Sequence, residues 1–213
     1  AIGVRILHVG KYFPPYAGGM EVFLADLVAV QRADGDEVAV LVHGTPEPDD
    51  PPWLERVPVR CTLAYAPVAP RFPFALARLL REFRPEVVHV HMPNPSAFAL
   101  LALSRAARIP WVVHWHSDVV AVPGSTHLSL AYRLYRPFEQ MLLARATRII
   151  ATSPPYLEAS TALAPWRDKC AVVPLGIDAA RYAAPEGEGA HDWSSGCCRL
   201  LALGRLSHYK NFG

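Results

Sequence analysis

The sequence predicts an α/β fold: a Rossmann-like doubly wound parallel sheet, followed by the start of a second Rossmann-like domain that is truncated. Two observations predict it: short apolar runs alternate with helix-like segments, and most of the runs are continuously apolar. Strands that are buried on both faces have this continuous apolar character, whereas half-exposed strands alternate apolar and polar residues. A repeated strand–helix–strand order is typical of a parallel sheet that helices cover on both faces.

Seven apolar runs have the length and composition of buried strands. They are Val4–Val9, Glu37–Val42, Val87–His91, Trp111–Trp115, Arg148–Thr152, Ala171–Pro174 and Leu200–Leu203. The first six complete one sheet by about Gly176, and the stretch rich in Gly, Ala and Ser that follows is predicted as a linker. A lone strand cannot form a domain. We therefore expect a domain over residues 1–178, a linker over 179–198 and the start of a truncated domain over 199–213.

The segments between the runs carry helical patterns. The first helix has apolar residues at i, i+3, i+4, i+7 and i+8 along one face and ends at Gly35. These apolar residues are Met20, Phe23, Leu24, Leu27 and Val28. Four more helices are predicted over the stretches FPFALARLLREFRPE, PSAFALLALSRAARIP, THLSLAYRLYRPFEQMLLARA and PPYLEASTALA. Pro85 ends the first of these four, and Pro137 breaks or kinks the third.

The composition indicates a folded protein with a large core, since hydrophobic residues make up 52% and charged residues 19% of the 213 residues. A net charge of +2 argues against a nucleic-acid partner, which would require a clustered basic excess. The opening residues lack a signal-peptide pattern, and no apolar run approaches the roughly 18 residues of a spanning helix. The four cysteines lack metal-ligand spacing and predict free thiols in a reducing compartment. We expect a cytoplasmic protein.

The unusual residues of the chain follow the predicted strands at their carboxyl ends. Ligands of open parallel sheets bind at that edge, near the point where the strand order reverses. Five segments are placed there: the Gly18–Gly19 pair, His91, the HWHSD stretch that contains His116 and Asp118, Ser153, and Asp178 in PLGID. Taken singly, each segment is also compatible with an ordinary loop that has no functional role. Taken together, they predict a cleft at one edge of the sheet.

The glycine pair lies in the stretch GKYFPPYAGGMEVF, between the first strand and the first helix. A dinucleotide fingerprint needs three glycines in the spacing G-x-G-x-x-G, which Gly10, Gly18 and Gly19 do not provide. A dinucleotide oxidoreductase is therefore disfavoured. Backbone N–H groups at a helix N-terminus can still bind an anion or sugar hydroxyls where no Cβ intervenes. Glu21, in the first helical turn, either lines the cleft or only complements the helix dipole.

Histidines are the second group of candidate functional residues, after the glycine pair. His116 lies just past a predicted strand end, and we interpret it as functional, with Asp118 placed to fix its tautomer. His114 is interpreted as structural. His89 and His91 flank a buried valine, but without an acidic partner they are a weak indication of a metal site. No metal is expected.

Basic residues are the third group of candidate functional residues. Arg205 and Lys210 place two cations around a strand-to-helix connection, which suits a pyrophosphate, although a solvated charged turn is an equal alternative. Arginines also gather on two predicted helices, where they can contact anionic lipid or simply be solvated. They are Arg78, Arg81, Arg84, Arg133 and Arg136.

Six motifs resemble, in this order, those of the GT-B glycosyltransferases of family 4, the retaining "group 1" enzymes. They are FPPYAGGME, VVHVHMPNP, VVHWHSDVV, IIATSPPYLEAS, VVPLGID and GRLSHYKNF, and they extend over nearly the whole chain. The resemblance implies two facing Rossmann-like domains, with the acceptor mostly on the first and the nucleotide-sugar on the second. It implies that Gly18 and Gly19 approach the donor phosphates and that His116 contacts the transferred sugar. Arg205 and Lys210 would neutralise the leaving diphosphate without a metal.

The resemblance further implies a hexosyl transfer, mannosyl or related, from a nucleotide-sugar to a glycan or lipid-linked acceptor in polysaccharide or lipopolysaccharide biosynthesis. From their places at the strand ends and in the first helical turn, Glu21, His91, Ser153 and Asp178 are expected to line the acceptor cleft. No cofactor is expected, and peripheral contact with the inner membrane face is an option. Asn211 replaces a usual glycine, and the E-x7-E donor segment would lie beyond the printed sequence, so we expect the 213 residues to be inactive alone. A GT-B UDP-sugar epimerase and a non-catalytic acceptor- or lipid-binding module are the alternatives.

Overall fold

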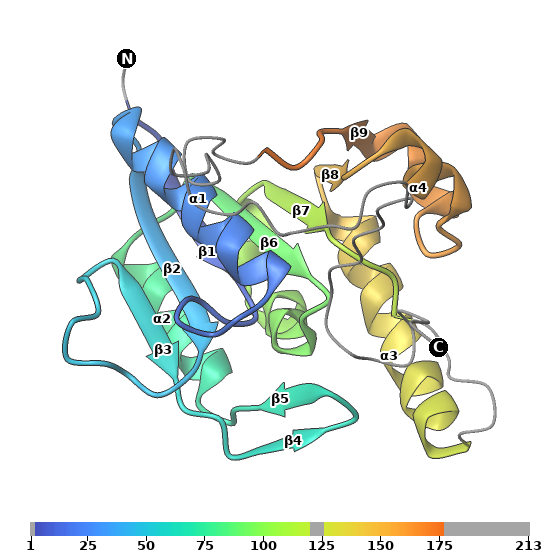
Figure 1. Cartoon of the computed structure of the whole chain (residues 1–213), viewed down its shortest axis with the longest axis horizontal. Coiled ribbons are helices and arrows are strands. Elements are labelled where there is room, and N and C mark those ends of the chain that lie inside the picture. The colour runs from blue at the N-terminus through green and yellow to red at the C-terminus, as the bar shows by residue number, and fades with distance from the viewer. Residues whose placement is uncertain (1–2, 120–125, 177–213) are drawn as a thin grey trace, which may run out of the picture. The chain divides into compact units, whose positions relative to one another are not determined.

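The computed structural model describes residues 3–119 and 126–176, which are coloured in Figure 1. The chain divides into two compact units, Ala1–Ile177 and Asp178–Gly213, and the description below concerns the first. The predicted linker, the predicted strand Leu200–Leu203 and the site residues Asp178, Arg205 and Lys210 lie outside the described residues.

A seven-stranded sheet with the order β3-β2-β1-β6-β7-β8-β9 forms the centre of the unit, and each pair of neighbouring strands is parallel. Its strands are β1 (Arg5–Val9), β2 (Glu37–His43), β3 (Leu54–Val57), β6 (Val87–Met92), β7 (Trp111–Trp115), β8 (Arg148–Ala151) and β9 (Cys170–Val172). The strand order reverses at β1, which has β2 on one side and β6 on the other. This confirms the predicted doubly wound sheet, and six of the predicted strands are present.

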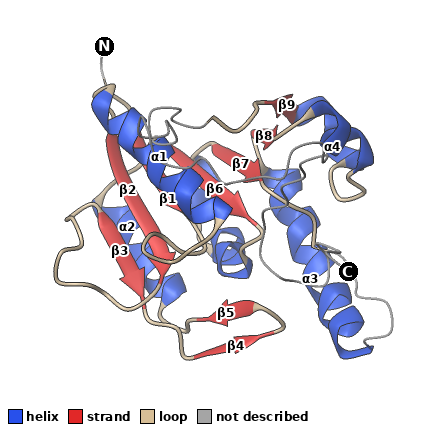
Figure 2. Ribbon diagram, in the orientation of Figure 1, coloured by secondary structure: helices blue, strands red, loops and turns tan. Residues whose placement is uncertain are grey.

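Two buried clusters of side chains cover the two faces of the sheet. Alternate residues of β2 belong to different clusters, because successive side chains of a strand point to opposite faces. Ala39 and Leu41 lie in the larger cluster, whereas Val38 and Val40 pack with Leu24 of α1 in the smaller one. The α-helices are α1 (Gly19–Ala33), α2 (Phe72–Glu82), α3 (Thr126–Arg145) and α4 (Pro154–Ala159). Figure 2 shows α1 and α2 on opposite sides of the sheet.

The edge strand β3 is absent from the sequence prediction. Two of its four residues, Glu55 and Arg56, are charged, and prolines flank it, so its pattern does not resemble a buried strand. Arg56 is nevertheless buried, because its guanidinium pairs with Asp50 at 2.9 Å and donates to the carbonyl oxygens of Phe13 and Pro14. The edge strand thereby holds the proline-containing half of the glycine loop.

One predicted α-helix is wrong. The stretch PSAFALLALSRAARIP forms two 3₁₀ helices, η1 (Pro95–Ala102) and η2 (Ala106–Arg108), with the extended residue Leu103 after the first. The buried residues Ala97, Leu100 and Ala106 are separated by multiples of three, which is the period of a 3₁₀ helix. A third 3₁₀ helix, η3 (Ala164–Lys169), precedes β9. The helix α3 continues past Pro137 rather than ending there.

A two-stranded hairpin, β4 (Cys61–Leu63) and β5 (Ala66–Val68), was also not predicted. Its turn residues Ala64 and Tyr65 both have left-handed backbone angles, with φ of 47° and 65°. Hairpin turns of this kind normally carry Asn-Gly or Gly, and neither is present to signal the turn in the sequence. Among the described residues, no helix combines the length and the apolar character needed to cross a bilayer.

The helix α3 buries a carboxyl group. Glu139 is fully buried, and the side chains of Tyr135 and Gln140 are its polar neighbours. Burial raises the pKa of Glu139 from 4.5 to about 7, because the charged form loses its hydration. The folded protein therefore retains this proton over a pH range in which the unfolded chain releases it.

We predict that Glu139→Gln stabilises the protein at pH 8 far more than at pH 5. The raised pKa of Glu139 in the folded state adds to the free energy of unfolding. This contribution is fully present below pH 4.5 and is lost as the pH rises to about 7. The neutral amide avoids that loss, which is on the order of 3 kcal/mol. Urea unfolding at both pH values measures the difference, with the exposed Glu158→Gln as the control. Equal gains at the two pH values would contradict the prediction.

Candidate functional site

Five histidines lie together near the carboxyl edge of the sheet, beside the position at which the strand order reverses. His8 belongs to β1, His89 and His91 to β6, and His114 to β7, whereas His116 follows β7 directly. His8 is paired in register with His89, and His91 with His114. Residues two apart on one strand share a face of the sheet, so the three strands place all five imidazoles on one side.

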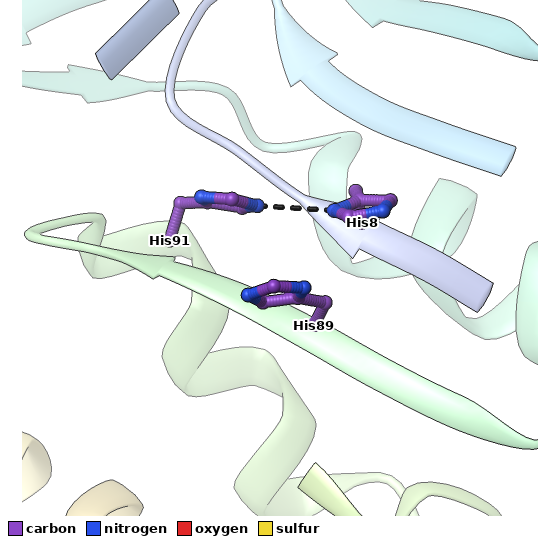
Figure 3. Close-up of side chains that lie close together, drawn as sticks. All are labelled: His8, His89 and His91. Carbon is purple, nitrogen blue, oxygen red and sulfur yellow. Dashed lines mark hydrogen bonds between the residues drawn. The ribbon is translucent and has the colours of Figure 1, made fainter. Parts of the chain in front are cut away.

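Three of the imidazoles form a hydrogen-bonded chain that begins at α1. Gln31 Oε1 lies 2.8 Å from His8 Nε2, and His8 Nδ1 lies 3.0 Å from His91 Nε2. His91 Nδ1 lies 3.2 Å from His116 Nε2. Figure 3 shows the contact between His8 and His91, with His89 beside them. His8 and His91 are buried, whereas His116 is partly exposed.

The remaining contacts of the cluster are ring contacts. His114 lies 4.5 Å from His116 between ring centroids, with an interplanar angle of 15°. Phe23 of α1 covers both rings, at 4.5 Å from His114 and 5.3 Å from His116. Both nitrogens of His114 and Nε2 of His89 are buried without a hydrogen-bond partner among the described residues. The first turns of α1 therefore pack directly on the histidine cluster.

Burial keeps these imidazoles neutral at pH 7. It lowers the pKa of His8 and His114 to about 4 and that of His116 to about 3, and it holds the pKa of His89 and His91 well below 6.5. In four of the five, neighbouring histidines lower the pKa further, because two adjacent positive charges repel. A neutral imidazole can accept a hydrogen bond, donate one, or ligate a metal.

Two groups of three histidines bring their nitrogens within 4.8 Å of one another, His8–His89–His91 and His91–His114–His116. Each group contains a face-to-face pair: the rings of His89 and His91 are 4.6 Å apart at 16°, and those of His114 and His116 are 4.5 Å apart at 15°. The lone pair of an imidazole lies in the plane of its ring, so stacked rings cannot both direct lone pairs at one ion. The geometry fits stacking and hydrogen bonding better than metal coordination.

The glycine pair lies at the start of α1. Gly19 has open space where a Cβ would be, with no atom within 4 Å, so its backbone is accessible to a ligand. Gly18 differs, because a Cβ there would collide with the carboxylate of Glu21. Glu21 is 6% exposed and folds back over the helix N-terminus instead of lining an open surface. The predicted cleft role of Glu21 is therefore not supported by its position.

Asp118 does not orient His116, contrary to the sequence prediction. Its Oδ1 accepts hydrogen bonds from Trp115 Nε1 at 2.7 Å, from Tyr156 OH at 2.6 Å and from Ser160 Oγ at 2.8 Å. These donors link the end of β7 to α4 and the residue after it. Within the part of the chain that the structure describes, the hydrogen-bond partner of the His116 ring is His91.

His91 and Ser153 have roles other than the predicted direct contact with an acceptor. His91 is 1% exposed and lies beneath His116, so it supports that residue and does not line an open cleft. Ser153 follows β8 as predicted, and its Oγ accepts from the backbone N–H of Tyr156 at 3.3 Å, which caps α4. The capping role of Ser153 has a local signal, because Ser followed by Pro154 is typical of a helix start, whereas only the convergence of the strands reveals the role of His91.

An apolar pocket of about 300 Å³ opens at the same edge of the sheet. Lys11, Pro93 and Val119 line it from the loops that follow β1, β6 and β7, while Tyr65 of the hairpin and Tyr135 of α3 line it from the other sides. The Lys11 ammonium donates to the backbone carbonyl of Tyr65 at 3.1 Å. The hairpin that the sequence did not predict thus forms one wall of the pocket.

We predict that the protein loses stability steeply below pH 6.5 and that His114→Phe makes this loss shallower. The lowered pKa of each buried histidine contributes stability that is fully present above pH 6.5 and is lost as the pH falls towards 4. The free energy of unfolding then falls by about 1.4 kcal/mol per pH unit for each histidine. Phenylalanine keeps a ring in contact with Phe23 and removes one titrating group. Thermal unfolding from pH 7.5 to 4.5 measures the slopes, and identical slopes for the two proteins would contradict the prediction.

Comparisons with known proteins identify the family. A family model described as the glycosyl transferase 4-like domain matches residues 18–176. The D-rhamnosyltransferase WbpZ of Pseudomonas aeruginosa is 28% identical over 213 residues, covering 97% of this chain and 54% of the relative. The O-antigen chain mannosyltransferase C of Escherichia coli is 28% identical over 181 residues, covering 82% of this chain and 46% of the relative. The chain thus spans about half the length of these relatives.

Solved structures share the fold. Sucrose-phosphate synthase from Thermosynechococcus elongatus superposes with a TM-score of 0.60 at 18% identity, over 82% of this chain and 49% of that one. Anabaena HepE in complex with UDP and glucose has a TM-score of 0.54 at 17% identity, over 84% of this chain and 46% of that one. The predicted resemblance is confirmed: the chain belongs to the glycosyl transferase 4-like family and has the Rossmann-like fold of the GT-B glycosyltransferases.

Proposed function

We propose that this chain is the acceptor-side part of a retaining glycosyltransferase that moves a hexosyl group from a nucleotide-sugar to a glycan or lipid-linked acceptor. One observation carries the proposal: in a domain of this family, the open backbone at Gly19 and the partly exposed His116 lie at the same carboxyl edge of the sheet. Phe23, one turn beyond Gly19, contacts the His116 ring at 5.3 Å and so links the two.

The relatives support a mannosyl or related donor. They are named as a D-rhamnosyltransferase, an O-antigen chain mannosyltransferase and GDP-mannose-dependent mannosyltransferases, whereas none of the curated relatives above is named as an epimerase. We therefore favour transfer over epimerisation and place the protein in cell-surface polysaccharide assembly on the cytoplasmic side.

Each site residue has a specific part in the proposed reaction. The N–H groups at the start of α1 bind donor phosphate oxygens or sugar hydroxyls, aided by the helix dipole. His116 makes a neutral hydrogen bond to the transferred sugar. Arg205 and Lys210 neutralise the diphosphate as its bond to the anomeric carbon breaks, and the acceptor oxygen bonds to that carbon on the same face. The acceptor proton leaves with the diphosphate, and no metal takes part.

The apolar pocket is the proposed place for the apolar part of a lipid-linked acceptor. It lies at the carboxyl edge and is walled by Tyr65 and Tyr135. We also propose that α3 makes the peripheral membrane contact, because its residues Leu134 and Phe138 are exposed one turn apart. The arginines of α2 suit it less, since Arg78 and Arg81 both pair with Glu82.

The proposal is tested on a polypeptide that contains this domain together with a donor-binding domain. Labelled GDP-mannose, GDP-rhamnose and UDP-glucose are each supplied with and without a glycan acceptor. We expect acceptor-dependent release of nucleotide and transfer of label, reduced at least about 100-fold by Arg205→Ala and by His116→Ala. Interconversion of nucleotide-sugars without acceptor would instead indicate an epimerase. Binding of anionic liposomes without turnover would indicate a lipid-binding module.

We predict that Gly19→Ala leaves the fold intact but weakens donor binding. No atom lies within 4 Å of the added methyl group, so the effect falls on a ligand that approaches the backbone. Gly10→Ala is the opposite control, because its Cβ would lie 2.6 Å from Leu24 Cδ2 and 3.1 Å from Val42 Cγ1 and would destabilise the core. Unfolding curves and donor titrations of both variants separate the effects. Unchanged donor affinity in Gly19→Ala would contradict the glycine-loop assignment.

A further inference from the structure

We propose that Gln31 sets the direction of the hydrogen bonds in the histidine chain, so that His116 reaches the site with Nε2 protonated and Nδ1 as an acceptor. Gln31 and His8 are then positioning residues, separated from the sugar by three and by two histidines. The functional meaning of this inference rests on the proposed glycosyl transfer, whereas the direction of the chain is a property of the folded domain alone.

The inference starts from the number of protons in the chain. A neutral imidazole has one N–H and one lone pair, so a ring that donates through one nitrogen must accept through the other. Gln31 Oε1 can only accept, and it contacts His8 Nε2 at 2.8 Å, so His8 donates through Nε2. His8 Nδ1 must then accept from His91 Nε2 at 3.0 Å.

The same constraint continues to the end of the chain. Because His91 donates through Nε2, its Nδ1 accepts from His116 Nε2 at 3.2 Å. His116 is left with its Nδ1 lone pair, for which the described residues provide no hydrogen-bond donor. One carbonyl oxygen on α1 thus determines the tautomer of a histidine on the far side of two buried rings.

The rings cannot escape the constraint by taking up a proton. His8 and His91 are at most 1% exposed, so a positive charge on either ring would lose its hydration. The chain therefore remains neutral and has two self-consistent directions. In the second, the Gln31 amide nitrogen would donate to His8, and His116 would present an N–H group to the ligand. The contact of Gln31 Oε1 selects the first.

The consequence is chemical selectivity. A His116 that presents a lone pair binds a group that donates, such as a sugar hydroxyl, and gains no hydrogen bond from a sugar that lacks this hydroxyl. The reversed tautomer would instead favour a ring oxygen, a carbonyl oxygen or a phosphate oxygen. The chain direction thus indicates that a donor sugar with a hydroxyl group facing His116 is the preferred class.

His43 provides an internal reference. It ends β2, and its Nδ1 lies 2.6 Å from the backbone carbonyl of Lys11, which can only accept. Its Nε2 lies 2.9 Å from Ser96 Oγ. His43 must therefore be the Nδ1–H tautomer, the reverse of the three rings in the chain, and Gln31 takes no part in its contacts.

Long-range ¹H–¹⁵N correlation spectra of the labelled 213-residue chain at pH 7.5 test the inference directly. We expect His8, His91 and His116 to be Nε2–H tautomers and His43 to be the Nδ1–H tautomer. Gln31→Met keeps the length of the side chain on α1 and removes the acceptor, so the ¹⁵N shifts of His8 and His116 should move towards averaged values while those of His43 stay unchanged. Nδ1–H at His8 or His116 in the parent, or unchanged tautomers in Gln31→Met, would overturn the proposal.

Gln31→Glu is the matched variant, because a carboxylate restores an obligate acceptor of the same length. It should retain the Nε2–H pattern, and loss of that pattern would also count against the proposal. In the transfer assay, Gln31→Met should lower kcat/KM by roughly tenfold or more and Gln31→Glu should recover it, since a wrong tautomer misdirects the ring. Absence of any transfer would refute the proposed function and leave the tautomer result standing. Equal activity of the three proteins would overturn only the positioning role.

Discussion

The pairing of β6 with β1 on one side and with β7 on the other holds the candidate site together. His8 lies beside His89, and His91 beside His114, only because the three strands are parallel and in this register. A shift of one residue in any strand would send its histidine to the opposite face. The stack of imidazoles, the contact of α1 with it and the position of His116 all depend on that register.

The histidine cluster destabilises the folded state, and apolar burial elsewhere in the domain offsets this. Buried nitrogens without partners, such as those of His114, lose hydration without a compensating hydrogen bond. On the opposite face of the same sheet large apolar side chains are fully buried, including Trp111 and Trp115 of β7. Burying such rings stabilises the fold by a few kcal/mol each. The hydrogen bond that we propose from His116 to the transferred sugar would give this destabilising cluster a function.

Two segments that are not part of the central strand–helix pattern shape the entrance to the site. Arg56 of the edge strand β3 binds the carbonyl oxygens of the glycine loop, while Asn94, after β6, donates to the carbonyl of Gly10 at 2.8 Å. The hairpin contributes Tyr65 to the apolar pocket. The loop before α1 is therefore held from both sides, which fixes the position of the helix N-terminus.

The sequence by itself determined the fold class, six of the strands, four of the helices and the edge at which the candidate site lies. Continuous apolar runs and residues such as Gly35 and Pro85 carry that information locally. It also singled out His116 and Gly19, because each follows a strand that is recognisable without its neighbours.

Only the tertiary structure decided the partners of these residues. The expectation that Asp118 orients His116 used closeness in the sequence, whereas the actual partner is His91, 25 positions earlier, and Asp118 binds side chains of the α4 region. His8 and Gln31 carry no motif, and their role depends on which strands lie next to each other. The edge strand, the hairpin and the 3₁₀ segments were missed for the same reason. Long-range packing decides their conformation, and local propensity is too weak to do so.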